Sequence, residues 1–279
     1  MKKAMFLSAL TAGLTMWGAS AAEKTAGELL TESGVKAIVS QGYCGAKRYT
    51  FTFEGFKAYF DEPANPKPGR PWMWCMKWPD AYAELTGQSD GVRRGYYYVY
   101  LDDIKWMSPA GTGLAKRFHD FLVVKLNFDE QAFLIGMSWG GFYSTRYAAA
   151  YPDDVARIYL DCPVMNFAQF RIDHWPQAKA QWGAPENGDW EKDPRMPINL
   201  AGKIAKSGIP VLLLYGAADL IVPPAGNCEK FISAYKANGG KDLQVFKRGM
   251  FGHHPHGFCG ASKVHNVVDF FEGKPISGE

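Results

Sequence analysis

A serine within a glycine-rich turn is the first candidate for chemistry in this chain of 279 residues. Ser138 is central to GMSWGG (136–141), which follows the apolar run AFLIG (132–136) and precedes an alanine-rich segment. A G-x-S-x-G sequence between a strand and a helix is typical of a strained turn that exposes a nucleophilic hydroxyl. We therefore expect Ser138 to attack a carbonyl carbon, and side chains at positions 136 or 140 to collide with neighbouring chain.

A serine hydroxyl needs a base to take its proton and an acid to orient that base. Asp219 lies just after the apolar run PVLLLYG (210–216), and acids at strand ends in open α/β sheets face the functional edge. Asp219 is therefore the expected acid. Asp161, at the end of the run RIYLD (157–161), is the alternative.

Three of the six histidines lie in GMFGHHPHGF (249–258), which follows the last expected strand. This is where the base belongs if the chain order is Ser, Asp, His. His253, directly after a glycine, is the expected base, His256 is its rival and His254 comes third. A zinc site needs three or four well-spaced ligands, which adjacent histidines without a nearby carboxylate do not provide, so we expect no metal.

Two backbone amides should stabilise the oxyanion that forms when a serine attacks a carbonyl group. One should belong to Trp139, the residue after the nucleophile, because the start of the following helix directs its N–H groups toward this point. The second should come from the loop at 74–77, where we expect the amide of Cys75 to serve.

The elements that must position these groups alternate between strands and helices. The expected strands are 48–54, 56–62, 72–76, 96–101, 132–136, 157–161, 210–216 and 243–247, and the expected helices are 79–85, 113–128, the segment after Ser138, 199–207, 226–238 and 263–271. Continuous apolar strands separated by helices predict an α/β fold with a mostly parallel eight-stranded sheet and helices on both faces. We expect one domain over 23–279, in which 164–208 forms a small cap insertion.

Residues 1–22 have the layout of a secretory signal peptide: two lysines, an apolar centre and small residues before Glu23. We expect cleavage there and export to the periplasm or beyond, with no membrane insertion afterwards. The formal net charge of +3 falls to +1 without Lys2 and Lys3, which leaves no electrostatic case for binding nucleic acid. Among the five cysteines we favour a pairing of Cys228 with Cys259, because both should lie near one rim of the fold.

From about residue 45 to its end the chain resembles the α/β-hydrolase superfamily, most of all secreted bacterial esterase-like members with a GxSxGG turn and a G-H-H-P-H loop. The resemblance implies the α/β-hydrolase fold with Ser138 as nucleophile, Asp219 as acid and His253 as base. It also implies acyl-enzyme chemistry without a metal or an organic cofactor.

Tryptophans crowd the expected mouth of this site, and we expect Trp74, Trp106 and Trp175 to bind substrate. Together with export, they favour a carbohydrate-linked or other small soluble ester as substrate; the oligomeric state is not indicated. Two alternatives stay open. The sequences GMSWGGF, D-x-x-V-P and H-G-F also resemble prolyl-oligopeptidase-type serine peptidases, and a hydrolase fold can serve as a catalytically silent binding protein.

Overall fold

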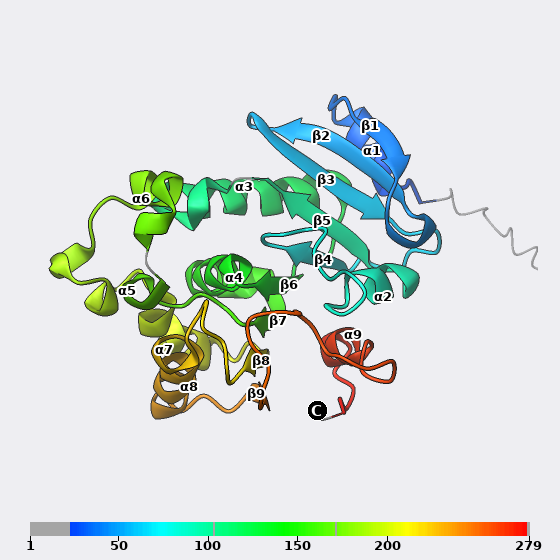
Figure 1. The fold of residues 1–279 in the computed structure, drawn as a ribbon. Coiled ribbons are helices and arrows are strands. Elements are labelled where there is room, and N and C mark those ends of the chain that lie inside the picture. The colour runs from blue at the N-terminus through cyan, green and yellow to red at the C-terminus, as the bar shows by residue number, and fades with distance from the viewer. Residues whose placement is uncertain (1–22, 103, 171, 278–279) are drawn as a thin grey trace, which may run out of the picture.

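The computed structural model describes residues 23–102, 104–170 and 172–277, so the expected signal peptide at 1–22 lies outside the described residues. Strands from the whole described chain form a single sheet (Figure 1). They are β1 (Ile38–Gln41), β2 (Lys47–Phe53), β3 (Phe56–Glu62), β4 (Trp72–Cys75), β5 (Tyr97–Leu101), β6 (Ala132–Met137), β7 (Val155–Asp161), β8 (Val211–Gly216) and β9 (Leu243–Arg248). Their order in the sheet is β1-β2-β3-β5-β4-β6-β7-β8-β9.

The sheet is antiparallel from β1 to β5 and parallel from β5 across to β9. This confirms a mostly parallel sheet that begins with the expected hairpin of β2 and β3. The expected number of eight strands is wrong, because β1 adds a ninth among the described residues. All four residues of β1 are exposed at the sheet edge, so no apolar alternation marks this strand in the sequence.

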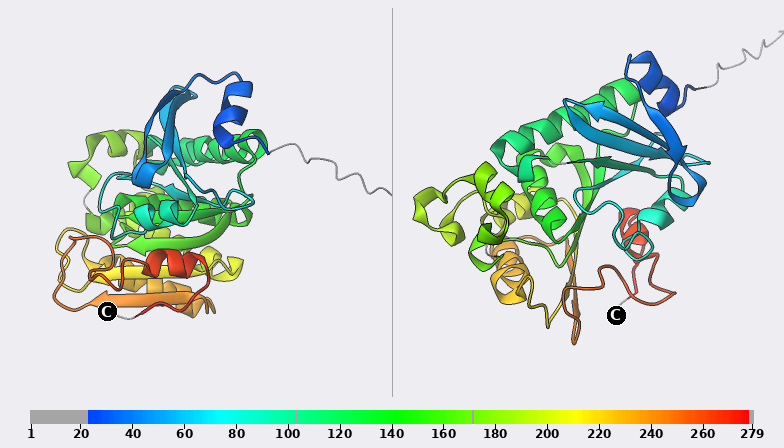
Figure 2. Two further views of the ribbon diagram at one scale, coloured as in Figure 1. Left: turned by 90° about the vertical axis from the view of Figure 1, so that its right-hand side faces the viewer. Right: turned by 45° about the horizontal axis from the view of Figure 1, so that its top comes forward.

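Helices cover both faces of the sheet (Figures 1 and 2). The α-helices are α1 (Ala26–Glu32), α2 (Gln88–Arg93), α3 (Pro109–Leu126), α4 (Trp139–Ala150), α5 (Phe167–Phe170), α6 (Pro176–Trp182), α7 (Pro197–Ser207), α8 (Cys228–Ala237) and α9 (Asn266–Phe271). Helices α1, α3, α4, α7 and α8 share one buried apolar cluster with the strands, whereas α2 and α9 share the other.

The side chains of strand β4 contribute to the apolar clusters on both faces of the sheet. Trp72 and Trp74 join the cluster that contains α3 and α4, whereas Met73 and Cys75 join the cluster that contains α2 and α9. Successive side chains of a strand point to opposite faces, so a strand covered on both sides needs an unbroken apolar run. This is why the central strands contain no polar alternation.

The expected helix at 79–85 is wrong, because turns occupy this stretch and the nearest helix, α2, begins only at Gln88. Trp78 and Tyr82 have φ angles of 61° and 53°. The left-handed region interrupts a right-handed helix, so the chain folds back here as a loop.

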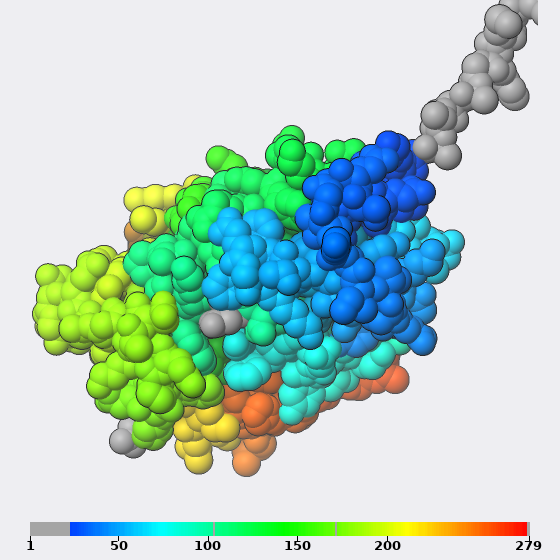
Figure 3. Space-filling model, turned by 90° about the horizontal axis from the view of Figure 1, so that it is seen from above, coloured from blue at the N-terminus to red at the C-terminus, as the bar shows by residue number. Residues whose placement is uncertain are grey.

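Between β7 and β8 the chain leaves the sheet and forms short helical pieces at one end of the molecule (Figures 1 and 3). Besides α5, α6 and α7 these are the 3₁₀ turns Ile172–His174, Glu186–Gly188 and Trp190–Lys192. Phe167 stacks on Phe142 of α4 with 4.6 Å between ring centroids, and the indole N–H of Trp182 donates to the carbonyl of Trp106 at 2.9 Å. These contacts hold the segment against the body of the fold.

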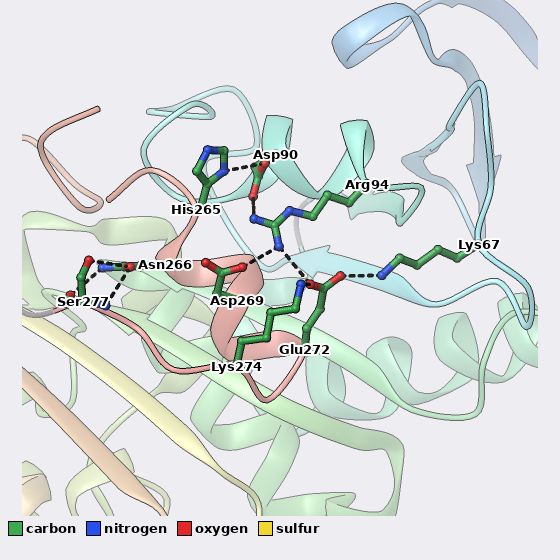
Figure 4. Close-up of polar contacts among 9 residues, drawn as sticks. All are labelled: Lys67, Asp90, Arg94, His265, Asn266, Asp269, Glu272, Lys274 and Ser277. Atoms are coloured by element: carbon green, nitrogen blue, oxygen red, sulfur yellow. Dashed lines mark hydrogen bonds and ion pairs between the residues drawn. The ribbon is translucent and has the colours of Figure 1, made fainter. Parts of the chain in front are cut away.

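An ionic cluster fastens the C-terminal helix α9 to α2 (Figure 4). Arg94 donates to Asp269 at 2.6 Å and to Glu272 at 2.9 Å. Lys67, Asp90, His265 and Lys274 take part in further polar pairs of this cluster. Burial alone would raise the pKa of Glu272, but hydrogen bonds from the two lysines and the nearby positive charges lower that pKa to about 2.

The favoured pairing of Cys228 with Cys259 is wrong, because Cys228 is a free thiol. Its side chain is buried in the apolar core at the first residue of α8, where it packs with the cluster that contains Phe231. In the described ranges, no helix combines the length and the apolar character that a membrane crossing requires.

Candidate active site

Ser138 lies at the turn between β6 and α4 with φ 50° and ψ −116°, a conformation that is strained for a residue with a side chain. A Cβ atom at Gly136 would lie 2.7 Å from the hydroxyl of Ser144, and one at Gly141 would lie 2.2 Å from Pro163. The expected collision therefore occurs at 136. At Gly140 the contact is looser, since a Cβ there would lie 3.3 Å from the amide nitrogen of Lys77.

The structure brings Ser138, His253 and Asp219 together in one hydrogen-bonded row. The Nε2 atom of His253 is 3.1 Å from the hydroxyl of Ser138, and its Nδ1 atom is 2.7 Å from Oδ2 of Asp219. All three side chains are buried. A carboxylate can only accept, so Nδ1 carries the proton and Nε2 is left to accept the proton of Ser138.

The loop after β8 holds Asp219 in its ionised form. Its second oxygen accepts the backbone N–H groups of Ile221 at 2.9 Å and Val222 at 2.8 Å. Burial raises the pKa of Asp219, but the hydrogen bonds from His253 and these two amides outweigh burial and lower it. The carboxylate is therefore a fixed anion beside the imidazole.

A cavity of about 360 Å³, here called the inner cavity, opens onto this row. Its lining is largely aromatic and apolar and includes Trp78, Ala81, Tyr82, Ser138, Trp139, Phe170, Trp175, Ile221, His253, His254 and His256. A second, outer cavity is lined by Gln169, Phe170, His174, Trp175, Leu220, Ile221 and Pro223. Because the two share Phe170, Trp175 and Ile221, they form adjoining parts of one cleft.

The chain has been compared with known proteins. A family model described as alpha/beta hydrolase fold matches residues 104–183. The S-formylglutathione hydrolase of Agrobacterium tumefaciens is similar in structure, with a TM-score of 0.56 at 13% identity over 85% of this chain and 95% of that one. This protein has the α/β-hydrolase fold.

Peptidases share the same hydrolase fold. Porphyromonas gingivalis dipeptidyl peptidase 4 has a TM-score of 0.60 at 11% identity, over 86% of this chain and 35% of that one. Pyrococcus horikoshii acylaminoacyl peptidase has a TM-score of 0.54 at 14% identity, over 78% of this chain and 37% of that one. The chain therefore spans only about a third of the length of these peptidases. A search of the curated proteins found no significant match to the sequence.

Within this hydrolase fold, the two expected oxyanion donors lie at different kinds of position. Trp139 is the first residue of α4, next to Ser138. Cys75 is the last residue of β4, inside the ladder. The amide of Met76 is also committed, since it donates to the carbonyl of Ile135 at 3.1 Å. The next amide, that of Lys77, lies against Gly140.

The three tryptophans expected to bind substrate have different surroundings. Trp175 lines both cavities. Trp106 supports the wall, because its ring meets those of Trp139 and Trp175 edge-on, with centroids 5.1 and 5.7 Å apart. Trp74 is wrong as a substrate contact: it is fully buried and packs against Trp72 and Phe118 in the core.

The structure pairs the two alternative candidates, Asp161 and His256, with each other. Nδ1 of His256 is 3.0 Å from Oδ1 of Asp161, which is entirely buried at the end of β7. The hydroxyl of Tyr159 donates to the other oxygen at 2.6 Å, and the amide of Gly257 also donates to it. Burial would raise the pKa of Asp161, but His256, Arg248 and Tyr159 lower it to about 2.

Arg248, at the end of β9, is a functional candidate that we did not expect from the sequence. Its guanidinium is buried and donates to the carbonyls of Pro255 at 2.9 Å and Gly257 at 3.1 Å. It also lies 3.9 Å from Asp161. Arg248 thus fixes the loop that carries His253. An arginine directly after an apolar strand and before the histidine cluster is the signal that could have indicated it.

Two groups of side chains offer donors for a metal ion. One contains Asp161, Cys162 and His256, and the other contains Cys162, Asp219 and His253, with the donor atoms of each group within 4.8 Å of one another. Burial raises the pKa of the Cys162 thiol, which disfavours the thiolate that metals bind. A guanidinium nitrogen of Arg248 also lies 3.7 Å from its sulfur. The histidines and acids already serve one another, so these donors fit a cation poorly.

Proposed function

We propose that this protein is a serine hydrolase that cleaves esters through an acyl-enzyme. The supporting observation is the row of hydrogen bonds from Asp219 through His253 to Ser138, which ends at the wall of the inner cavity. In this proposal Ser138 attacks the ester carbonyl while Nε2 of His253 takes its proton. His253 then returns the proton to the leaving alcohol and later activates the water that releases the acid.

We assign the oxyanion contacts to the backbone amides of Trp139 and Lys77, with Lys77 in place of Cys75. Trp139 begins a twelve-residue helix, whose N-terminal dipole favours negative charge at this point. Lys77 is the first residue after β4 whose amide is not used by the sheet ladder described above, and it lies beside Gly140. Both amides come from backbone that the parallel sheet holds in place.

The surroundings of Ser138 favour an uncharged ester of modest size. The inner cavity is mainly apolar and holds about 360 Å³, which suits a small acyl group rather than a polypeptide strand. We propose that 164–208 acts as a cap, since Phe170 and Trp175 of this segment line the cavity. The structural neighbour of which this chain covers 95% is by its name a hydrolase of S-formylglutathione and not a peptidase.

A peptidase is the second candidate, because two of the structural neighbours described above are peptidases. The test is hydrolysis of p-nitrophenyl acetate compared with an aminoacyl p-nitroanilide, with Ser138→Ala as the control. We expect the ester alone to be cleaved, and only by the protein that retains Ser138. Faster cleavage of the anilide would favour the peptidase. Undiminished activity in Ser138→Ala would exclude the proposed nucleophile.

We also propose that residues 1–22 direct export, on the composition described above. Expression in a bacterium that processes secretory precursors, followed by N-terminal sequencing, tests this proposal. A mature chain that begins close to Glu23 is expected. An exported protein whose N-terminal sequence still contains Lys2 and Lys3 would contradict the proposal.

A further inference from the structure

The inner cavity is lined by two imidazoles that the proposed reaction does not use, those of His254 and His256. Its lining includes three histidines, whose ring centroids lie 4.9 to 5.1 Å from one another. His253 is committed at both nitrogens, to Ser138 and to Asp219. His254 is exposed and stacks on the ring of Tyr82. His256 is buried, and a buried carboxylate fixes its ring.

The contacts of His256 determine its tautomer. Asp161 accepts from Tyr159, from the amide of Gly257 and from Nδ1 of His256, and Arg248 lies close by. An ionised carboxylate has no proton to donate, so the Nδ1 atom of His256 must carry one. In the neutral ring Nε2 is then a hydrogen-bond acceptor, and among the described residues His256 forms its hydrogen bond through Nδ1 and not through Nε2. Among the histidines that line the inner cavity, His256 is thus the one whose free acceptor is oriented by a buried carboxylate.

The position of His256 indicates which part of a substrate it meets. His253 must hand its proton to the leaving alcohol, so that alcohol passes beside the His253 ring. The His256 ring lies edge-on to the same ring, with 4.9 Å between centroids. The ring of Tyr82 also lies edge-on to that of His256, with 5.5 Å between centroids. A group that reaches Nε2 of His256 therefore belongs to the alcohol part, close to the scissile bond.

We propose that His256 is a specificity-determining residue that accepts a hydrogen bond from a second hydroxyl of the alcohol part, so that esters of diols, polyols or sugars are the preferred substrates. This inference rests on the proposed function. Asp161 is a positioning residue that acts through His256. A few polar groups in an apolar cavity fix the orientation of a ligand. One hydrogen bond of this kind should raise the preference for a hydroxylated ester over its apolar analogue by about tenfold.

Two esters of equal size test the proposal: 2-hydroxyethyl acetate and propyl acetate, which differ only by a hydroxyl in place of a methyl group. The protein should prefer the hydroxylated ester by about tenfold in kcat/KM. In His256→Asn the shorter amide can still donate to Asp161 but leaves nothing at the position of Nε2, so the preference should disappear. In His256→Gln the longer amide can reach that position, and part of the preference should return.

His265→Asn is the matched control. His265 also pairs through Nδ1 with an aspartate, Asp90 at 2.9 Å, but it lies in the cluster of α2 and α9 and lines neither cavity (Figure 4). This variant should keep the preference of the parent. An unchanged preference in His256→Asn, or an equal loss on both esters, would overturn the inference, because the second result indicates a merely structural role.

Labelling of Ser138 with diisopropyl fluorophosphate separates this inference from the proposed function. If Ser138 is labelled but the two esters do not differ, whether both are cleaved equally or neither is cleaved, the inference about His256 fails and the serine nucleophile stands. If Ser138 is not labelled and neither ester is cleaved, the proposed function fails and this inference fails with it.

Discussion

At the scale of single residues, His253 and His256 differ in the aspartate to which each is hydrogen-bonded. His253 and His256 are three positions apart, both are buried, and each has Nδ1 on an aspartate. Only His253 presents Nε2 to Ser138 among the contacts of the described residues. The aspartate that a histidine contacts therefore indicates its role better than its position along the loop does.

The base is assigned to His253 rather than to its neighbour, and this assignment predicts different results for two variants. We expect His253→Ala to lower kcat on p-nitrophenyl acetate by at least about 10⁴-fold, because the nucleophile loses its proton acceptor. His254→Ala removes a ring that touches neither Ser138 nor an acid, and should change kcat by less than about tenfold. The measurement is steady-state kinetics, with thermal unfolding as the check on the fold. The opposite ranking would move the base to His254.

The buried carboxylate of Asp161 predicts a loss of stability in acid. Its pKa of about 2 in the folded protein lies below the value of about 3.9 for an unfolded chain. Ionised Asp161 therefore stabilises the fold fully above about pH 4, and this contribution is lost as the pH falls toward 2. We expect it to account for about 3 kcal/mol of the free energy of unfolding.

Urea unfolding at several pH values between 5 and 2 measures this contribution. The free energy of unfolding should fall less steeply with pH in Asp161→Asn, which has no proton to gain, than in the parent. Asp153→Asn, at an exposed aspartate before β7, serves as the control and should follow the parent curve. Parallel curves for the parent and Asp161→Asn would contradict the assignment.

At the scale of elements, apolar runs predicted the strands of the parallel sheet, and the order of motifs along the chain predicted that Ser138, Asp219 and His253 lie together. The sequence could not predict β1, because its four exposed residues carry no burial pattern. The turn at 79–85 depends on two left-handed residues, which no periodicity indicates. The role given to Trp74 was avoidable: in a strand covered on both faces, every side chain of the run is buried.

The end of β9 predicts a stability effect at Arg248. We expect Arg248→Ala to lower the free energy of unfolding by about 3–5 kcal/mol, because it removes a buried positive charge near Asp161 and leaves the carbonyls of Pro255 and Gly257 without their donor. Lys247→Ala is the neighbouring control, since Lys247 is exposed and its ammonium contacts Glu229 and the ring of Tyr215 at the surface. It should cost less than about 1 kcal/mol. Equal effects in urea unfolding would show that Arg248 does not anchor the loop.

At the scale of the whole molecule, the cleft lies where two parts of the chain meet. The carboxyl edge of the sheet supplies Ser138, Asp219 and the histidine loop, whereas the segment between β7 and β8 supplies Phe170 and Trp175. The segment between β7 and β8 thus lines the cleft without carrying any of the proposed catalytic residues, and it shares the lining with the turn that contains Trp78 and Tyr82 and with His256. Substitutions in the second part should alter binding more than the chemical step.

Trp175 provides the corresponding test. Trp175→Ala removes an aromatic wall from both cavities, and we expect KM for p-nitrophenyl acetate to rise about tenfold while kcat changes by less than about threefold. Trp190→Phe, in the same segment but lining neither cavity, should leave KM unchanged. A fall of kcat with constant KM in Trp175→Ala would place this residue in the chemical step instead.

Two aspartates lie at or just after the ends of neighbouring strands of the sheet, and each is hydrogen-bonded to a histidine: Asp161 of β7 to His256, and Asp219 after β8 to His253. This arrangement gives the protein an evolutionary reserve. A lineage that lost His253 would keep a second oriented ring, that of His256, whose centroid lies 4.9 Å from that of the His253 ring. A laboratory selection that starts from His253→Ala should therefore restore activity first through insertions and deletions at 254–258. A change of length there could bring His256 to Ser138. A new residue would then take over the contact of His256 with the substrate.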